Sequence, residues 1–159
     1  MVQANRQGPA AIEAEALAQT VVRLLPVLIR TVVAEMHKAP ETAGMTLPQF
    51  RVLARLYERD YRAAELADAL EVGRPTLTAT ADGLERRGLI ERSRQVPGDR
   101  RGVLLHITPS GRALYCVLQD QAVAGVARLV ADSTPRERQA LAEGLAALER
   151  GLRRPGRGA

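Results

Sequence analysis

The chain has 159 residues, the length of one ordinary domain. Its formal net charge of +5 and sequence pI near 10.3 favour an acidic partner, and nucleic acid more than a membrane. Aromatic residues make up 3% of the chain, too few to favour the binding of single-stranded nucleic acid by base stacking. The single cysteine leaves no disulfide framework and fits a reducing cytoplasm. Because the first residues also lack the charged-then-apolar order of a signal peptide, we expect a cytoplasmic protein.

The N-terminal segment reads as a tail followed by a long apolar helix. Residues 1–10 are polar and contain a Gly-Pro pair, which predicts a flexible tail. Residues 11–44 begin with apolar side chains at three- and four-residue spacing as far as His37 and end in a loop. The apolar face is wide enough to require burial against more than its own domain, and Pro26 should kink or break the helix. Because charged residues interrupt the segment, we expect no membrane span; they are Arg23, Arg30 and Glu35.

Residues 45–108 contain the patterns around which the rest of the chain is organised. They open with a capping box, in which Thr46 is followed three residues later by Gln49. A helix should run from there to about Glu58. Residues 59–63 are expected to connect this helix to the next element.

Two short helical patterns follow, separated by a tight turn at residues 71–73. Their inward apolar positions are Leu66, Ala67 and Leu70 in the first helix and Leu77, Ala81 and Leu84 in the second. Ala64 stands where a serine or threonine cap is usual, so the first helix should start weakly. Two helices joined by a short turn that contains glycine form a helix-turn-helix motif.

A β-hairpin is predicted directly after the second helix. Gly88 can end that helix in a left-handed conformation, and residues 89–93 and 102–108 read as strands around a turn signal at residues 97–99. A helix-turn-helix followed by a hairpin is a winged helix. Residues 86–101 hold six arginines against two acidic residues, a net charge of +4 by counting, which suits a polyanion.

Residues 109–152 are expected to form two further helices. Thr108 can cap the first of them, which should extend to about Ala131. A second capping box, from Thr134 to Glu137, opens a last helix with leucines at near-heptad spacing, and residues 153–159 should be a flexible tail. Like the N-terminal helix, these helices are apolar and carry no catalytic pattern. We therefore expect them to pair with the same helices of a second copy in a homodimer.

This ordered set of motifs resembles the MarR family of transcriptional regulators. The matching stretches are LPQFRVL at 47–53, LA at 66–67, LERRGLIER at 84–92, DRR at 99–101 and LHITPSG at 105–111. The resemblance implies a mainly α fold with a small β-hairpin wing, in which a winged helix-turn-helix domain at 45–108 is flanked by dimerisation helices. It also implies a homodimer that binds double-stranded DNA, more often as a repressor than as an activator, and is released by a small aromatic or phenolic effector.

The inward positions of the second helix leave one stripe of that helix for DNA. We expect Arg74 to bind guanine or phosphate, and Thr76 and Thr78 to bind phosphates or base edges, with simple capping or exposure as a nearly equal alternative for the threonines. Pro75 starts the helix, and Ala79 stands where many relatives carry arginine, so one DNA contact should be missing. The remaining predicted DNA-binding residues are Arg86, Arg94, Asp99, Arg100 and Arg101. The resemblance implies that Arg101 enters or lines the minor groove while Asp99 orients arginine side chains.

Outside the DNA-reading stretch, few residues suggest chemistry. His37 and Tyr115 are weak candidates for effector contacts, since each is more often a packed or surface residue, and Cys116 is expected to be a small buried residue. No metal-ligand spacing links the two histidines and the cysteine, so no metal or cofactor is expected. The chain has no Gly-rich phosphate loop, HExxH or nucleophile elbow, which argues against an enzyme. Two alternatives stay open: a winged helix that acts through protein–protein contacts, and a redox-responsive regulator that uses Cys116.

Overall fold

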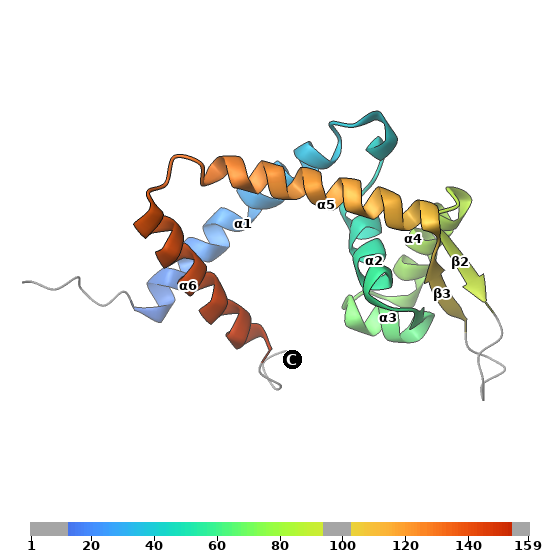
Figure 1. Cartoon of the computed structure of the whole chain (residues 1–159). Helices are drawn as coiled ribbons and strands as arrows, with labels where there is room; N and C mark the ends of the chain where they lie inside the picture. Colours follow the sequence, from blue (N-terminus) through green and yellow to red (C-terminus); the bar gives the residue numbers. More distant parts are fainter. Residues whose placement is uncertain (1–12, 94–102, 154–159) are drawn as a thin grey trace, which may run out of the picture.

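The computed structural model describes residues 13–93 and 103–153, which form a helical arm and a lobe that holds the sheet (Figure 1). In chain order the elements are α1 (Ala14–Met36), α2 (Leu47–Glu58), β1 (Tyr61–Arg62), α3 (Ala63–Ala69), α4 (Arg74–Arg86), β2 (Ile90–Ser93), β3 (Leu104–Ile107), α5 (Pro109–Leu129) and α6 (Pro135–Leu152). A short 3-10 helix, Pro40–Thr42, connects α1 to α2. The fold is mainly α with a small antiparallel sheet, as the sequence predicts.

The core of the lobe lies where α2, α3 and α4 pack against the sheet. Its fully buried side chains come from all of these elements and include Leu53, Leu56, Leu66, Leu84, Ile90 and Leu105. The three α4 positions assigned inward from the sequence are buried, which confirms that assignment: Leu77, Ala81 and Leu84. Each large aliphatic side chain buried in this way contributes roughly 1.5–3 kcal/mol relative to exposure.

The sheet has three strands, one more than the sequence predicts. β1 pairs antiparallel with β3, which pairs on its other side with β2, giving the order β1-β3-β2. Tyr61 lies opposite Leu105, and Ile90 lies opposite Ile107. Residues 59–63 do connect α2 to α3, but the strand within them was not predicted, because two residues have no periodicity by which a strand could be detected.

The start of α3 also differs from the expectation. The helix begins at Ala63 with Arg62 in the cap position, so Ala64 lies inside the first turn and is not the cap. The Glu65 carboxylate accepts a hydrogen bond from the backbone N–H of Arg62 at 3.4 Å. This reciprocal half of a capping box supports the helix start that the sequence marked as weak.

Two residues with positive φ shape the turns on either side of α4. Before the helix, Glu71 has a φ of 54°, a conformation that costs a non-glycine residue about 1 kcal/mol or more, while Gly73 takes an ordinary extended φ and caps α4. After the helix, Gly88 has a φ of 67°, which confirms the predicted left-handed end. The chain then turns directly into β2.

Three threonines start helices as the sequence predicts. Thr46 and Gln49 form a complete capping box at α2, and Thr134 and Glu137 form another at α6. The hydrogen bond from the backbone N–H of Thr134, and to a smaller extent that from its hydroxyl, lowers the pKa of the Glu137 carboxyl. At α5, the Thr108 hydroxyl accepts from a backbone N–H at 3.0 Å, a bond of the kind that stabilises a helix start by about 1 kcal/mol.

Within the arm, α1 and α5 cross at close range. A Cβ at Gly125 would lie 2.4 Å from Cγ of Glu35, so glycine allows the two helices to approach here. The Glu35 carboxylate is 12% exposed and pairs with Arg128 and, at 2.6 Å, with Lys38. The hydrogen bond from Arg128, and to a smaller extent that from Lys38, lowers the pKa of the Glu35 carboxyl.

α1 is unusually apolar for an exposed helix. It runs unbroken through Pro26, so the break that was one expected outcome does not occur. By length and composition alone it could cross a membrane, which corrects the expectation that its charged residues rule this out; a helix of a soluble protein can meet the same criteria. In the single chain several of its large apolar side chains are exposed: Leu17, Val22, Leu24, Leu25, Val27, Leu28 and Ile29.

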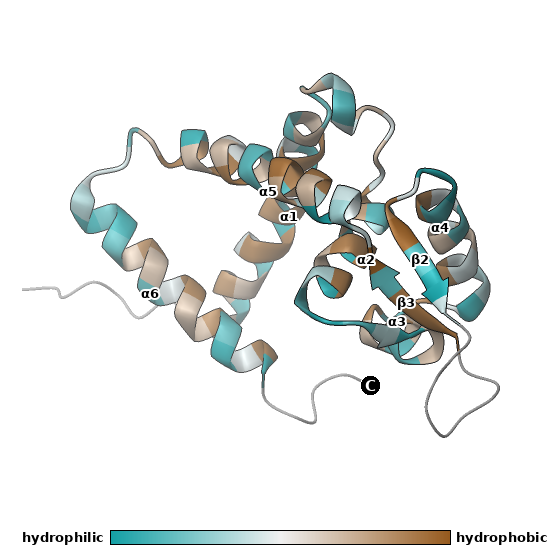
Figure 2. Cartoon of the chain, turned by 45° about the vertical axis from the view of Figure 1, so that its right-hand side comes forward, coloured by the Kyte–Doolittle hydropathy of each residue, from teal (hydrophilic) through white to brown (hydrophobic). Residues whose placement is uncertain are grey.

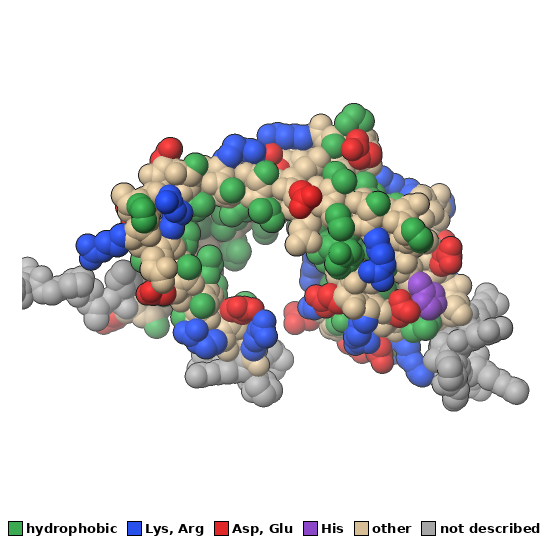
Figure 3. Space-filling view, in the orientation of Figure 1, with side chains coloured by type: hydrophobic (Ala, Val, Ile, Leu, Met, Phe, Trp, Pro, Cys, Tyr) green, Lys and Arg blue, Asp and Glu red, His purple; other side chains and the backbone are tan. Residues whose placement is uncertain are grey.

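α6 begins beyond the end of α5 that is far from the lobe and runs back below α5 (Figures 1 and 2). Its leucines form an exposed stripe, made of Leu141, Leu145, Leu148 and Leu152. In Figure 3, hydrophobic side chains of the arm line the hollow that separates the arm from the lobe. The described residues of one chain thus leave both α1 and α6 with uncovered apolar faces.

Candidate nucleic-acid interface

α4 presents the predicted DNA-reading residues on its open side. The exposed residues of its N-terminal half are Arg74, Pro75, Thr76, Thr78 and Ala79. The helix starts at Arg74, with Gly73 as its cap, so unpaired backbone N–H groups and the positive end of the helix dipole lie at this end. An exposed arginine beside such a helix start is a favourable arrangement for a phosphate group.

Arg86 lies apart from that group, although the sequence assigned it to the same interface. It is exposed at the opposite end of the 13-residue helix, about 18 Å from Arg74 along the axis. Arg86 can therefore meet only a different part of a DNA duplex from the part that faces the N-terminal half of α4.

The hydroxyls of Thr78 and Thr80 in α4 donate to carbonyl oxygens of their own helix. Oγ1 of Thr78 donates to the carbonyl oxygen of Arg74 at 2.9 Å, and Oγ1 of Thr80 donates to that of Thr76 at 2.8 Å. Such bonds to the preceding turn are common for threonine inside helices. They restrict which groups on DNA these hydroxyls could bind, a restriction that the sequence does not reveal.

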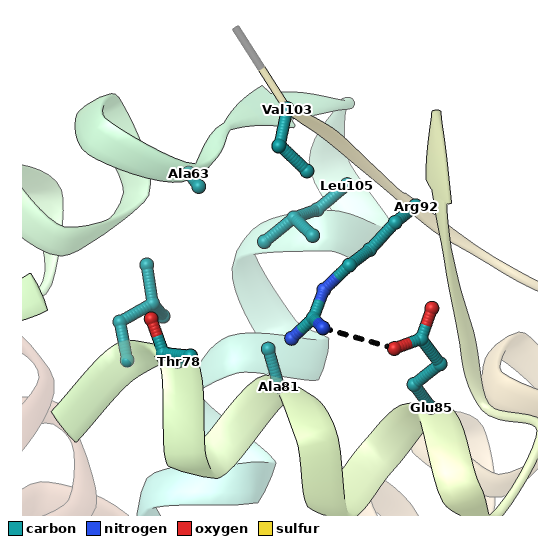
Figure 4. Close-up of a pocket in the computed structure, with 8 residues that line it drawn as sticks. Ala63, Thr78, Ala81, Glu85, Arg92, Val103 and Leu105 are labelled. Carbon is teal, nitrogen blue, oxygen red and sulfur yellow. Dashed lines mark ion pairs between the residues drawn. The ribbon is translucent and has the colours of Figure 1, made fainter. Parts of the chain in front are cut away.

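Arg92 of β2 is one of the clustered basic residues noted in the sequence, but its contact with α4 was not predicted. Its guanidinium lies across α4 and pairs with Asp82 at 2.6 Å and with Glu85 at 3.0 Å. Figure 4 shows it reaching from the strand over a cavity of about 480 Å³ that lies between α4 and the sheet. Arg92 thereby ties β2 to α4 and compensates two carboxylates next to the exposed stripe of predicted DNA-binding residues.

Gly83 allows α4 to lie close to the start of α2. A Cβ at this position would lie 2.9 Å from Nε2 of Gln49, whose Oε1 accepts the N–H of Thr46 in the capping box at 3.0 Å. A side chain at Gly83 would therefore push against that box.

Four of the predicted DNA-binding residues lie outside the described residues. They are Arg94, Asp99, Arg100 and Arg101, which fall between the ends of β2 and β3. Their roles stay predictions. The strands on either side pair from Ile90 with Ile107 to Ser93 with Leu104.

The two weak effector candidates lie in different surroundings. Nε2 of His37 donates to the Met45 carbonyl at 2.7 Å and so holds the loop after α1. Tyr115 of α5 stacks on Phe50, with ring centroids 5.7 Å apart, and contacts Tyr57 at 4.7 Å between centroids. Burial raises the pKa of Tyr115. These aromatic rings lie at the contact between α2 and α5, where the arm meets the lobe.

Cys116 is exposed, so the expectation that it is a buried residue is wrong. It lies two residues before Leu118, the buried position of this turn of α5, and two residues of helix rotate a side chain by roughly 200°. Its Sγ lies 3.8 Å from the Tyr57 hydroxyl, and this hydrogen bond raises the pKa of Tyr57. Among the described residues no three His, Cys, Asp or Glu side chains form a group that could hold a metal ion.

Comparisons with known proteins agree with this geometry. The model of the MarR family matches residues 45–103. YfiV of Bacillus subtilis, an uncharacterised HTH-type transcriptional regulator, is 28% identical over 109 residues, 68% of each chain. MdtR of the same organism, an HTH-type transcriptional repressor, is 34% identical over 88 residues, which cover 55% of this chain and 56% of MdtR. The solved structure of Sco3205, a MarR family transcriptional regulator from Streptomyces coelicolor in complex with DNA, is similar with a TM-score of 0.66 at 24% identity over 94% of each chain. Residues 45–103 thus match the MarR family, and the chain shares the fold of the MarR family regulator Sco3205.

Proposed function

We propose that the protein is a homodimeric repressor that binds a pseudo-palindromic operator in the cytoplasm and is released by a small aromatic or phenolic effector. The observation that carries the DNA-binding part is the exposed N-terminal half of α4, where Arg74, Thr76 and Thr78 stand at the start of the recognition helix. The complex of Sco3205 with DNA supports this use of the fold. The similarity to MdtR, a transcriptional repressor, supports repression rather than activation.

Each part of the lobe has its own task in this proposal. Arg74 binds a guanine or a phosphate at the edge of the major groove, and Arg86 binds the backbone farther along the helix. In the hairpin the roles follow the family resemblance: Arg94 and Arg100 bind phosphates, while Arg101, oriented by Asp99, lines the minor groove.

The first test is binding of the purified protein to the DNA upstream of its own gene. We expect tighter binding there than to a random duplex, with half-sites about one helical turn, roughly 34 Å, apart. If about six phosphates are neutralised, affinity should fall roughly a thousandfold between about 50 and 200 mM salt. Fluorescence anisotropy titrations of both duplexes at several salt concentrations measure the preference and the salt slope together. Equal, weak binding to the two duplexes would instead favour the winged helix that acts through protein contacts.

The homodimer is proposed because the arm cannot cover its own apolar faces. Leu145 and Leu152 of α6 are 57% and 80% exposed, and Val22 of α1 is 66% exposed. A shallow apolar groove on the arm, lined by Val32, Val123 and Val126 among others, is also open. Exposed apolar surface on this scale is typical of an interaction site. A two-fold pair would bury both arms at once and would set two recognition helices on one face.

Leu145→Glu is expected to weaken the dimer by at least about tenfold, because it adds a charge to a stripe that the partner would desolvate. Sedimentation equilibrium measures the dissociation constant, and operator binding should fall with it. Gln139→Glu is the control, since it adds the same charge on the polar side of α6. It also loses the hydrogen bond from Nε2 of Gln139 to Glu143 and pairs two like charges, which should cost the helix only about 0.2–0.5 kcal/mol. A wild-type protein that sediments as a monomer at tens of micromolar would overturn the dimer proposal.

The effector is proposed to bind where the arm meets the lobe, a position that the family resemblance supplies. Tyr115, among the aromatic rings between α2 and α5, and His37, at the end of α1, are the proposed contacts. Binding there would change the spacing of the two recognition helices and shift the population away from the DNA-binding state. The same anisotropy assay, repeated with an aromatic carboxylate, tests the release.

A further inference from the structure

We propose that Thr78 selects an A·T base pair in the operator, an inference that rests on the DNA-binding function proposed above. The hydroxyl of Thr78 donates its proton to the Arg74 carbonyl at 2.9 Å. A hydroxyl has one proton and a carbonyl oxygen can only accept, so the direction of this bond is fixed. Thr78 therefore offers two groups to DNA: a hydroxyl oxygen that can accept, and a methyl group.

These two groups exclude most partners in the major groove. Phosphate oxygens, guanine O6 and N7, adenine N7 and thymine O4 all accept hydrogen bonds, so binding any of them would break the bond between Thr78 and Arg74. The groups that remain are the amino groups of adenine and cytosine, which donate, and the methyl group of thymine. An A·T pair carries both an amino group and a methyl group, whereas a G·C pair carries no methyl group.

The neighbouring residue has the same preference. Ala79 is exposed and adds a second methyl group without any donor, which again suits a thymine methyl group. One turn farther along the helix, Asp82 is held by Arg92 at 2.6 Å. In the described part of α4, the middle of the exposed stripe thus lacks a side chain that is free to donate to guanine, whereas Arg74 at the helix start can do so.

Thr80 provides a control within the same helix. Its hydroxyl makes the equivalent bond, to the carbonyl of Thr76 at 2.8 Å. Thr80 is half-buried and lines a small cavity of about 70 Å³ between α2 and α4, whereas Thr78 is exposed and lies at the edge of the larger open cavity between α4 and the sheet. Removing the Thr80 hydroxyl should therefore change the helix in the same way without changing any contact to a base.

The experiment starts by selecting bound duplexes from a random pool with the full-length wild-type protein. Each A·T pair of the selected half-site is then replaced by G·C, by A·U, which lacks the methyl group, and by a pair in which purine replaces adenine and lacks the amino group. At one pair of each half-site we expect G·C to weaken wild-type binding about tenfold. Thr78→Val keeps the methyl group and should become insensitive to the missing amino group, whereas Thr78→Ser keeps the hydroxyl and should become insensitive to the missing methyl group.

Thr80→Val should behave as the wild type does on every duplex. Threonine, serine and valine have similar helix propensities, so differences in folding are small. If the wild type enriches no sequence, the proposed function fails and this inference fails with it. If the wild type enriches an operator but the Thr78 variants keep the same preference at every pair, or lose affinity equally on all duplexes as a lost phosphate contact would, only the role of Thr78 is overturned.

Discussion

Gly111→Ala is expected to destabilise the lobe by about 3 kcal/mol or more, because the added Cβ would lie inside its core. That Cβ would be 2.0 Å from the carbonyl oxygen of Leu89. The oxygen belongs to backbone and is held in place, since it accepts the N–H of Thr108 at 3.1 Å, while the N–H of Leu89 donates to Leu84 at 3.0 Å. Thermal unfolding should show a Tm lower by on the order of 10 °C, together with weaker operator binding as the start of α5 shifts against β2.

Ser110→Ala is the matched control for this variant. Ser110 is exposed in the same first turn of α5, and such surface substitutions usually change stability by less than about 0.5 kcal/mol. A Gly111→Ala protein that melts with the wild type and binds the operator equally would show that the Leu89 carbonyl does not fix the start of α5.

The contact between Gly111 and Leu89 is an example of a structural feature that cannot be predicted from local sequence patterns. The helix boundaries were predictable where chemistry is local: the capping boxes at Thr46 and Thr134 mark their helices because cap and partner lie three residues apart. Gly111 also stood in a matching motif, yet the reason for glycine there is the backbone of Leu89, 22 residues earlier in the chain by its number. Contacts of this kind depend on tertiary packing, which no local pattern reports.

In the candidate site, too, the features set by local pattern were predictable and those set by tertiary contacts were not. The exposed stripe of α4 followed from helical periodicity, since Leu77, Ala81 and Leu84 had to face inward. The position of Arg92 did not follow, because its partners Asp82 and Glu85 lie on another element. The exposure of Cys116 was missed because a general tendency of free cysteines towards burial was applied to a residue that α5 turns outward.

Arg92→Ala should weaken operator binding on the order of 100-fold, because it leaves two carboxylates uncompensated beside DNA phosphates. Asp82 and Glu85 are 40% and 41% exposed and now share the Arg92 guanidinium at 2.6 Å and 3.0 Å. The same change should cost little stability, since ion pairs this exposed contribute about 0–1 kcal/mol and the Tm should fall by no more than about 4 °C. Anisotropy titrations and thermal unfolding of the same preparation compare the two effects.

A direct phosphate contact by Arg92 would also predict weaker binding, but with a different dependence on salt. Loss of one phosphate contact lowers the salt slope of binding by about one. If Arg92 acts by compensating the carboxylates, the phosphate contacts of the other residues remain. The slope then stays close to that of the wild type, while affinity falls at every salt concentration.

Removing the two carboxylates in the Arg92→Ala background separates these roles decisively. Asp82→Asn combined with Glu85→Gln keeps the size of both side chains and removes their charges, so most of the lost affinity should return if repulsion caused the loss. In the presence of wild-type Arg92 the same two changes should have a smaller effect, because those charges are already paired. If the triple variant binds no better than Arg92→Ala alone, Arg92 contacts DNA itself, and its pairing with Asp82 and Glu85 only holds the guanidinium in place for that contact.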